Sequence, residues 1–202
     1  MSTRPSRKDE ILGALAAMLE EAPGARITTA GLAKQVGVSE AALYRHFPSK
    51  AKMYEGLIEF IENTLFSRIS VILGETEATD DRCRQMVFLI LSFAEKNPGI
   101  TRILTGDPLA GESDRLRIRV AQLFERLETQ FKQVLREADL RDRMQVRGTV
   151  AIAAGLMMNV VEGRLSQFVR TEFRRLPTEE WTSLWLAVHE GVFLPGQGPG
   201  DA

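Results

Sequence analysis

The chain has 202 residues, 44% of them hydrophobic, so it can bury a core as one domain or as a small domain joined to a larger one. Its formal net charge is only −1, and its single cysteine, Cys83, excludes a disulfide within the chain. No apolar run reaches the roughly 18 residues of a membrane span, and no charged-then-apolar leader follows Met1, so we expect a cytoplasmic protein without membrane span or secretion signal.

The first predicted helix carries apolar residues at helical spacing and ends at Pro23-Gly24. Its apolar positions are Ile11, Leu12, Leu15, Ala16, Met18 and Leu19. We expect this helix to support two short helices that follow it.

The segment 27–50 predicts a helix, a tight turn and a second helix. Thr28 or Thr29 can cap the first helix, whose apolar positions are Leu32, Ala33 and Val36. Gly37 can end that helix with a positive φ, and Ser39 can cap the next. Because so short a link makes two helices cross steeply, the spacing indicates a helix-turn-helix.

In a helix-turn-helix the second helix, here residues 39–46, lies in the major groove of DNA. The side chains free to face the DNA from it are Ser39, Glu40, Ala41, Tyr44 and Arg45. Phosphate contacts are expected from polar side chains and from a capped helix start. The positions are Thr28, Thr29, Tyr44, His46, Lys50 and Lys52. Lys34 is a further DNA-binding candidate. Arg45 fits two roles, a bidentate contact with guanine or a phosphate contact.

The competing interpretation is a two-helix corner inside a helical bundle, with Tyr44 and Phe47 as core aromatics. The charge distribution favours DNA. Residues 1–52 hold eight Lys and Arg against five Asp and Glu, a balance of +3, whereas the remainder has a balance of −4. A basic segment in a nearly neutral protein is typical of a local nucleic-acid footprint.

The remaining chain predicts further helices and no strand, because no segment alternates apolar and polar residues for long enough. The expected helices lie near 49–74, 80–97, 100–105, 116–134, 146–173 and 181–192, with a loop over 106–111. We therefore expect an all-α protein of about nine helices. Its parts would be a DNA-binding head at 1–48, a helical dimerisation and partner-binding body at 49–194 and a flexible tail at 195–202.

The last two helices are candidates for a homodimer interface. Small residues that permit close helix contact occur at Ala151, Ala153, Ala154 and Gly155, and two tryptophans follow. Both features also suit packing within one chain. A two-fold four-helix interface is the sharper hypothesis, because helix-turn-helix proteins usually bind two half-sites one DNA turn apart.

Catalysis has little support in the sequence. The two histidines are His46, in the predicted recognition helix, and His189, near the end. Neither belongs to a Ser-His-acid arrangement or to a cluster with metal-ligand spacing. We therefore expect a binding protein that is not an enzyme and has no cofactor or metal.

The predicted DNA-binding segment resembles the signature of the TetR family. The residues that carry the resemblance are Thr28-Thr29, Leu32-Ala33, Val36-Gly37-Val38-Ser39, Leu43-Tyr44 and His46-Phe47-Pro48-Ser49-Lys50. The family resemblance implies a repressor that a small molecule entering the body releases from DNA. Phe131, Met157, Met158 and Phe168 would line such a pocket, or are simply core.

A narrower resemblance, to the nucleoid-occlusion branch of the TetR family, covers most of the chain. It rests on residues 39–50, 57–62, 97–106, 123–126, 133–137 and 162–170. It implies a nucleoid-associated dimer that binds palindromic chromosomal sites and, on DNA, antagonises assembly of the tubulin-like division protein FtsZ, which blocks septum formation over the nucleoid.

The same resemblance implies a site for the acidic, partly apolar tail of FtsZ. The positions are Phe60, Arg68, Leu89, Lys96 and Asn97. Arginine and lysine would supply charge, and the two apolar side chains burial. The alternative is that Phe60 and Leu89 are core and the other three are solvated or cap helices. Lys96 stands where the branch has arginine, so it keeps the charge but lacks the planar fork. The 106–113 loop and the Gly- and Pro-rich end also depart from the branch.

Overall fold

The computed structural model describes residues 6–21, 27–109, 114–138 and 144–194. Across these residues the chain forms nine α-helices and one short 3₁₀ helix, so the all-α prediction is confirmed. A single isolated β-bridge pairs Val146 with Phe193. The described residues contain no β-strand beyond this bridge. The predicted tail at 195–202 lies outside the described residues.

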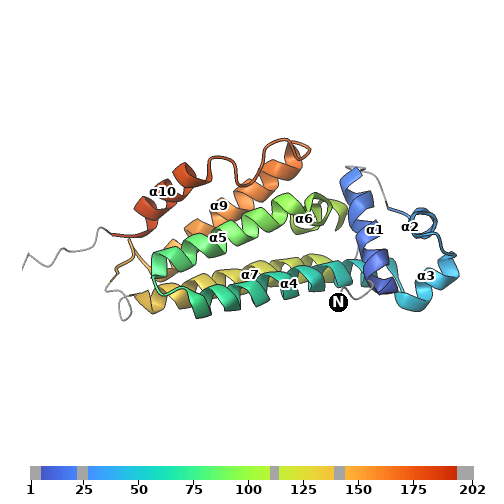
Figure 1. The fold of residues 1–202 in the computed structure, drawn as a ribbon, viewed down its shortest axis with the longest axis horizontal. Helices are drawn as coiled ribbons and strands as arrows, with labels where there is room; N and C mark the ends of the chain where they lie inside the picture. Colours follow the sequence, from blue (N-terminus) through green and yellow to red (C-terminus); the bar gives the residue numbers. More distant parts are fainter. Residues whose placement is uncertain (1–5, 22–26, 110–113, 139–143, 195–202) are drawn as a thin grey trace, which may run out of the picture.

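Three helices form the head: α1 (Arg7–Glu21), α2 (Thr29–Val36) and α3 (Glu40–His46). Their bounds match the three predicted elements. α1 packs on both α2 and α3, and the apolar residues that point inward from it are Ile11, Leu15 and Leu19. In Figure 1 the head stands at one end of the molecule, with α1 between α6 and the pair α2 and α3.

The body is built from long helices that run roughly along the long axis of the molecule (Figure 1). These are α4 (Lys50–Glu75), α5 (Thr79–Lys96), α7 (Asp114–Arg136) and α9 (Val150–Arg170). α10 (Trp181–Val192) packs on α5 and α9. Helix α4 begins shortly after α3 ends and packs on α1, so it joins the head to the body.

A short connection places the body against the head. Helix α6 (Pro98–Leu104) packs on α1, and the 3₁₀ helix η1 (Asp107–Leu109) follows it. The sequence predicted that one helix ends near residue 97 and that the next begins near residue 100. The structure begins α6 at Pro98, because proline is tolerated in a first helical turn, where its missing N–H has no intrahelical partner.

Buried apolar side chains from the head and the body form one hydrophobic cluster. Cys83 lies within it, and burial raises the pKa of its thiol far above the ordinary value. Among the described helices, none combines the length and the hydropathy that crossing a membrane requires.

Candidate nucleic-acid interface

The turn between α2 and α3 has the capping geometry of a helix-turn-helix. Thr28 is the N-cap of α2, and its hydroxyl accepts a hydrogen bond from the Gly31 amide at 3.1 Å. Gly37 ends the helix with φ 74°, a conformation that glycine adopts without steric cost. Ser39 then caps α3 by accepting from the Ala42 amide at 3.2 Å. The capping residues Thr28, Gly37 and Ser39, all recognisable in the sequence, therefore fix where the two helices begin and end.

A hydrogen-bond network ties the start of α2 to α3. The Thr29 hydroxyl donates to the Glu40 carboxylate at 2.8 Å, and the Tyr44 hydroxyl donates to the Thr29 hydroxyl at 3.3 Å. All three are sequence-predicted DNA-binding candidates, but their contacts with one another were not predicted. The spacing of four between Glu40 and Tyr44, which puts both on one face of α3, was the available signal.

Most predicted DNA-binding side chains lie on the surface of the head. The exposed ones are Thr28, Lys34, Ser39, Glu40, Ala41, Tyr44 and Arg45, and Thr29, His46 and Lys50 are half-buried. Tyr44 keeps 42% of its surface exposed, whereas Phe47 is buried in the core. The alternative of a buried corner was therefore right for Phe47 and wrong for Tyr44.

The two lysines at the start of α4 differ in their contacts. The Lys50 ammonium lies 5.5 Å from the centre of the Tyr54 ring, a cation–π distance. Lys52 instead forms an ion pair with Glu55 at 2.6 Å. The expected phosphate role of Lys52 therefore competes with a carboxylate of the same chain.

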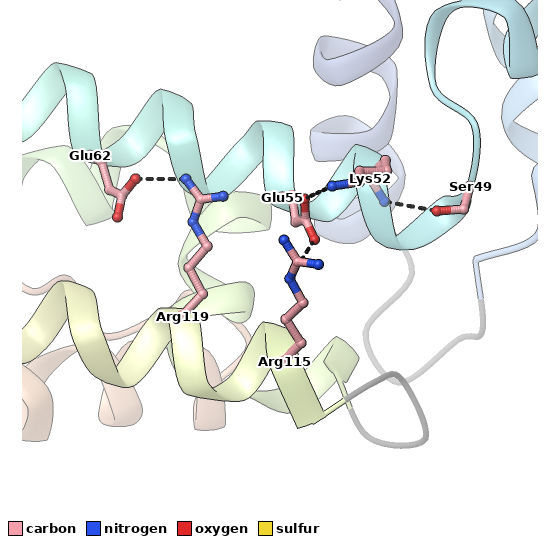
Figure 2. Close-up of polar contacts among 6 residues, drawn as sticks. All are labelled: Ser49, Lys52, Glu55, Glu62, Arg115 and Arg119. Atoms are coloured by element: carbon pink, nitrogen blue, oxygen red, sulfur yellow. Dashed lines mark hydrogen bonds and ion pairs between the residues drawn. The ribbon is translucent and has the colours of Figure 1, made fainter.

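Ion pairs between Glu55 and Glu62 of α4 and arginines of α7 hold the two helices together next to the head (Figure 2). We call this set of ion pairs the α4–α7 ladder. Glu55, which is largely buried, pairs with Arg115 at 3.3 Å as well as with Lys52. Its pKa is lowered, mainly by the hydrogen bond from Lys52, with the positive charge of Arg115 adding to the effect and burial opposing it. Glu62 pairs with Arg119 at 2.9 Å and with Arg126 at 3.1 Å. These contacts were not predicted from the sequence.

The five residues of the predicted FtsZ-tail site lie on two neighbouring helices. Phe60 and Arg68 are on α4, Leu89 and Lys96 are on α5, and Asn97 directly follows α5. Phe60 is 46% exposed, with its ring 6.3 Å from the Phe93 ring, so the alternative of a core position is wrong for this residue.

The other members of this set differ in exposure. Arg68 and Lys96 are exposed, and Leu89 is half-buried against the core. Asn97 donates from its amide to the Phe93 carbonyl at 2.7 Å and stands between α5 and α6, which agrees with the helix-capping alternative.

Helices α9 and α10 expose large apolar side chains, and of the four predicted small residues Ala151 is exposed and Gly155 half-buried. Ala153 and Ala154 are buried in this chain's own core. By contrast, Ile152 is 65% exposed and Leu186 58% exposed, and Leu156 is also exposed. The two tryptophans stack on each other at 5.9 Å and pack against the body.

The four residues considered for a ligand pocket are buried side chains. Phe131, Met157, Met158 and Phe168 each have less than 5% of their surface exposed. A separate surface recess of about 280 Å³ lies between α4 and α7, lined by Phe66, Ser70, Arg126, Thr129 and Gln130. None of the four residues lines that recess.

Comparison with known proteins agrees with both parts of the fold. The family model described as bacterial regulatory proteins, tetR family, matches residues 11–57, and the SlmA-like model described as tetracyclin repressor-like, C-terminal domain, matches 77–192. The nucleoid occlusion factor SlmA of Alteromonas mediterranea is 59% identical over 184 residues, 91% of this chain and 94% of the relative. The chain belongs to the SlmA family of nucleoid occlusion factors, within the TetR family.

Other SlmA relatives and solved structures agree with this assignment. The SlmA proteins of Marinomonas sp. and Idiomarina loihiensis are 55% and 54% identical, over 93% and 92% of this chain and 95% and 94% of theirs. The fold is similar to PfmR of Thermus thermophilus, with a TM-score of 0.74 at 21% identity over 91% of this chain and 98% of PfmR. For FadR of Bacillus halodurans the TM-score is 0.80 at 14% identity, over 94% of this chain and 98% of FadR. These two likenesses show the fold alone.

Proposed function

We propose that this protein is a sequence-specific DNA-binding nucleoid occlusion factor that, on chromosomal palindromic sites, antagonises FtsZ assembly and so keeps septa off the nucleoid. The observation that carries the proposal is 59% identity to a nucleoid occlusion factor over 91% of the chain. The likeness extends through the body and beyond the DNA-binding head. We infer a binding role without catalysis, in the cytoplasm at the nucleoid.

The proposed division of labour follows the two parts of the chain. Residues 1–48 would bind DNA, with α3 in the major groove and the exposed side chain of Arg45 in the last turn of that helix. Lys34 and Lys50 would contact phosphates and so position the head without reading sequence. Residues 49–194 would dimerise and bind the partner.

A homodimer through α9 and α10 is supported by what these helices expose. Ile152, Leu156 and Leu186 are large apolar residues on the surface of one chain. A second copy would remove them from water, and a two-fold arrangement would present the same surface from both chains. Two recognition helices could then occupy the two halves of a palindrome.

The FtsZ tail would lie across α4 and α5. Phe60 offers an exposed ring for an apolar side chain of the tail, while Arg68 and Lys96 offer positive charge for its acidic residues. The lysine makes a point contact with a carboxylate where an arginine would make two parallel hydrogen bonds.

Co-sedimentation of FtsZ polymers tests the proposal directly. The pelleted FtsZ would be measured with this protein alone, with a duplex carrying one of its genomic sites, and with the same duplex scrambled. We expect the largest loss of polymer with the genomic site. Unchanged polymer in all three, together with a small molecule that releases the protein from DNA, would instead establish a ligand-controlled repressor.

A chromosome-wide map of binding sites gives a second, independent readout. Many dispersed sites are expected of a protein that reports where the nucleoid lies. A single site beside the protein's own gene would contradict that role and favour the repressor.

A further inference from the structure

The head and the body touch backbone to backbone where α1 crosses α6. Gly99 is buried in the first turn of α6, and a Cβ atom added to it would lie 2.0 Å from the Ala16 carbonyl oxygen and 2.9 Å from the Glu20 amide nitrogen. Both atoms belong to the backbone of α1, so they cannot move aside as a side chain would. Any residue larger than glycine must push α1 away from α6.

Arg102, one turn further along α6, holds the end of α1. Its side chain is 2% exposed, and its Nη1 atom donates to the Leu19 carbonyl oxygen at 2.5 Å. Leu19 is in the last turn of α1, where carbonyl groups lack intrahelical partners and positive charge is favourable. The Nε atom of Arg102 donates to Asp107 of η1 at 2.7 Å, which balances the buried charge.

Helix α6 is itself anchored to the body. The Thr101 side chain is fully buried, and its hydroxyl lies 2.9 Å from the carbonyl oxygens of Ala94 and Asn97, at the end of α5. Movement of α6 would therefore disturb α5. Since α1 packs on α6 on one side and on α2 and α3 on the other, α1 transmits the position of α6 to the helix-turn-helix.

We propose that Gly99 and Arg102 are positioning residues for DNA recognition, which set the angle of the head on the body. The inference rests on the proposed homodimer, because in a dimer this angle decides the separation of the two α3 helices. α3 lies far from α6 in Figure 1, so a small rotation at the contact becomes a larger displacement at the DNA. A palindrome requires the two recognition helices about 34 Å apart, one helical turn of DNA.

The test compares two duplexes, one with the natural palindrome and one with a half-site scrambled, by fluorescence anisotropy. Gly99→Ala should weaken binding to the palindrome at least about tenfold and to the half-site less than about twofold, since it moves the head without altering α3. The matched control is Gly13→Ala, an exposed position of α1 where an added Cβ meets nothing within 4 Å. It should bind both duplexes as the unchanged protein does.

Two results would overturn the proposal: unchanged binding of Gly99→Ala to the palindrome, or equal loss on both duplexes. If Gly99→Ala fails to fold by circular dichroism, Arg102→Lys and Asp107→Asn replace it, because they alter the bond to α1 or its partner without adding bulk. They should show the same selective loss for the palindrome, and an equal loss on both duplexes would again refute the proposal.

Sedimentation of the unchanged protein separates the proposed homodimer from the proposed role of Gly99 and Arg102. A monomer refutes the dimer and this inference with it, whereas a dimer insensitive to all three substitutions refutes only this inference.

Discussion

Glu40 places a negative charge on the face of the head that the proposed function turns toward DNA. Its carboxylate accepts a hydrogen bond from the Thr29 hydroxyl. The Thr29 hydroxyl in turn accepts a hydrogen bond from the Tyr44 hydroxyl. A carboxylate near phosphates opposes binding to every sequence, so its benefit must be selectivity or the alignment of α2 with α3.

We expect Glu40→Gln to bind random duplex more tightly and the natural site by a smaller factor, so that the ratio of the two affinities falls. The amide keeps a hydrogen-bond acceptor for Thr29 but removes the repulsion. Titrations of both duplexes at one salt concentration measure the ratio, with Glu75→Gln, at the far end of α4, as the control. An unchanged ratio would show that Glu40 only aligns the two helices.

Arg45 and Lys50 should separate base recognition from phosphate contact. Lys50→Ala should weaken binding to all sequences alike and reduce the slope of log K against log salt by about 0.9, the loss of one phosphate contact. If Arg45 contacts guanine, Arg45→Ala should also relax base preference at one position, by about 1–3 kcal/mol. Equal losses on natural and random duplex for both variants would contradict this division.

At the scale of elements, the α4–α7 ladder joins helices that the sequence leaves far apart. Glu62, with 14% of its side chain exposed, contacts two arginines of α7. We expect Glu62→Gln to lower the free energy of unfolding by about 1–2 kcal/mol, below the cost of a fully buried pair because Arg126 is half in solvent. The urea midpoint measures it. Asp114→Asn breaks an exposed pair with Arg117 and should cost less than about 0.5 kcal/mol.

The lowered pKa of Glu55 makes part of this stability depend on pH. The folded protein holds the Glu55 pKa below its ordinary value of 4.5, mainly through Lys52, so the unfolded chain binds the proton first as pH falls. The stabilisation is therefore present above pH 4.5 and disappears as pH falls through the folded-state pKa. Glu55→Gln should flatten the stability curve in that acid range, measured by urea unfolding between pH 3 and 7. An equally steep curve would assign the acid sensitivity to other groups.

Local signals explain why the helix-turn-helix was predictable and the contacts that orient it were not. Thr28, Gly37 and Ser39 act within three or four residues, so their spacing alone indicates the two helices. By contrast, Glu62 and Arg119 are 57 residues apart, and no pattern in either helix pairs them. Gly99 was expected to lie between two helices, but it stands in the first turn of α6 in close contact with the backbone of α1.

The small residues of α9 show a second limit of sequence patterns. Apolar periodicity identifies helix α9 but does not say which of its apolar faces meets the core of its own chain. Ala153 and Ala154 face that core, whereas Ile152 and Leu156 lie on the surface. The predicted helix is confirmed, and of its four small residues Ala153 and Ala154 pack within this chain, whereas Ala151 is exposed and Gly155 half-buried.

At the scale of the whole molecule, the exposed apolar side chains of α9 and α10 carry the dimer proposal, so substitutions there should separate folding from assembly. Leu186→Glu, alone or with Ile152→Glu, places charge where a second chain would bury apolar surface, and we expect a monomer at micromolar concentration by sedimentation. The melting temperature of the isolated chain should change little, because both side chains are already in solvent.

The matched control is Ile118→Glu on α7, which is 56% exposed but lies outside α9 and α10. It introduces the same charge on an equally exposed isoleucine and should leave the dimer intact. The monomeric variant should keep the affinity of one head for a half-site and lose the gain from the second, since two linked heads bind a palindrome with a high effective concentration. If Ile118→Glu disrupts assembly and Leu186→Glu does not, the dimer forms through α7 instead.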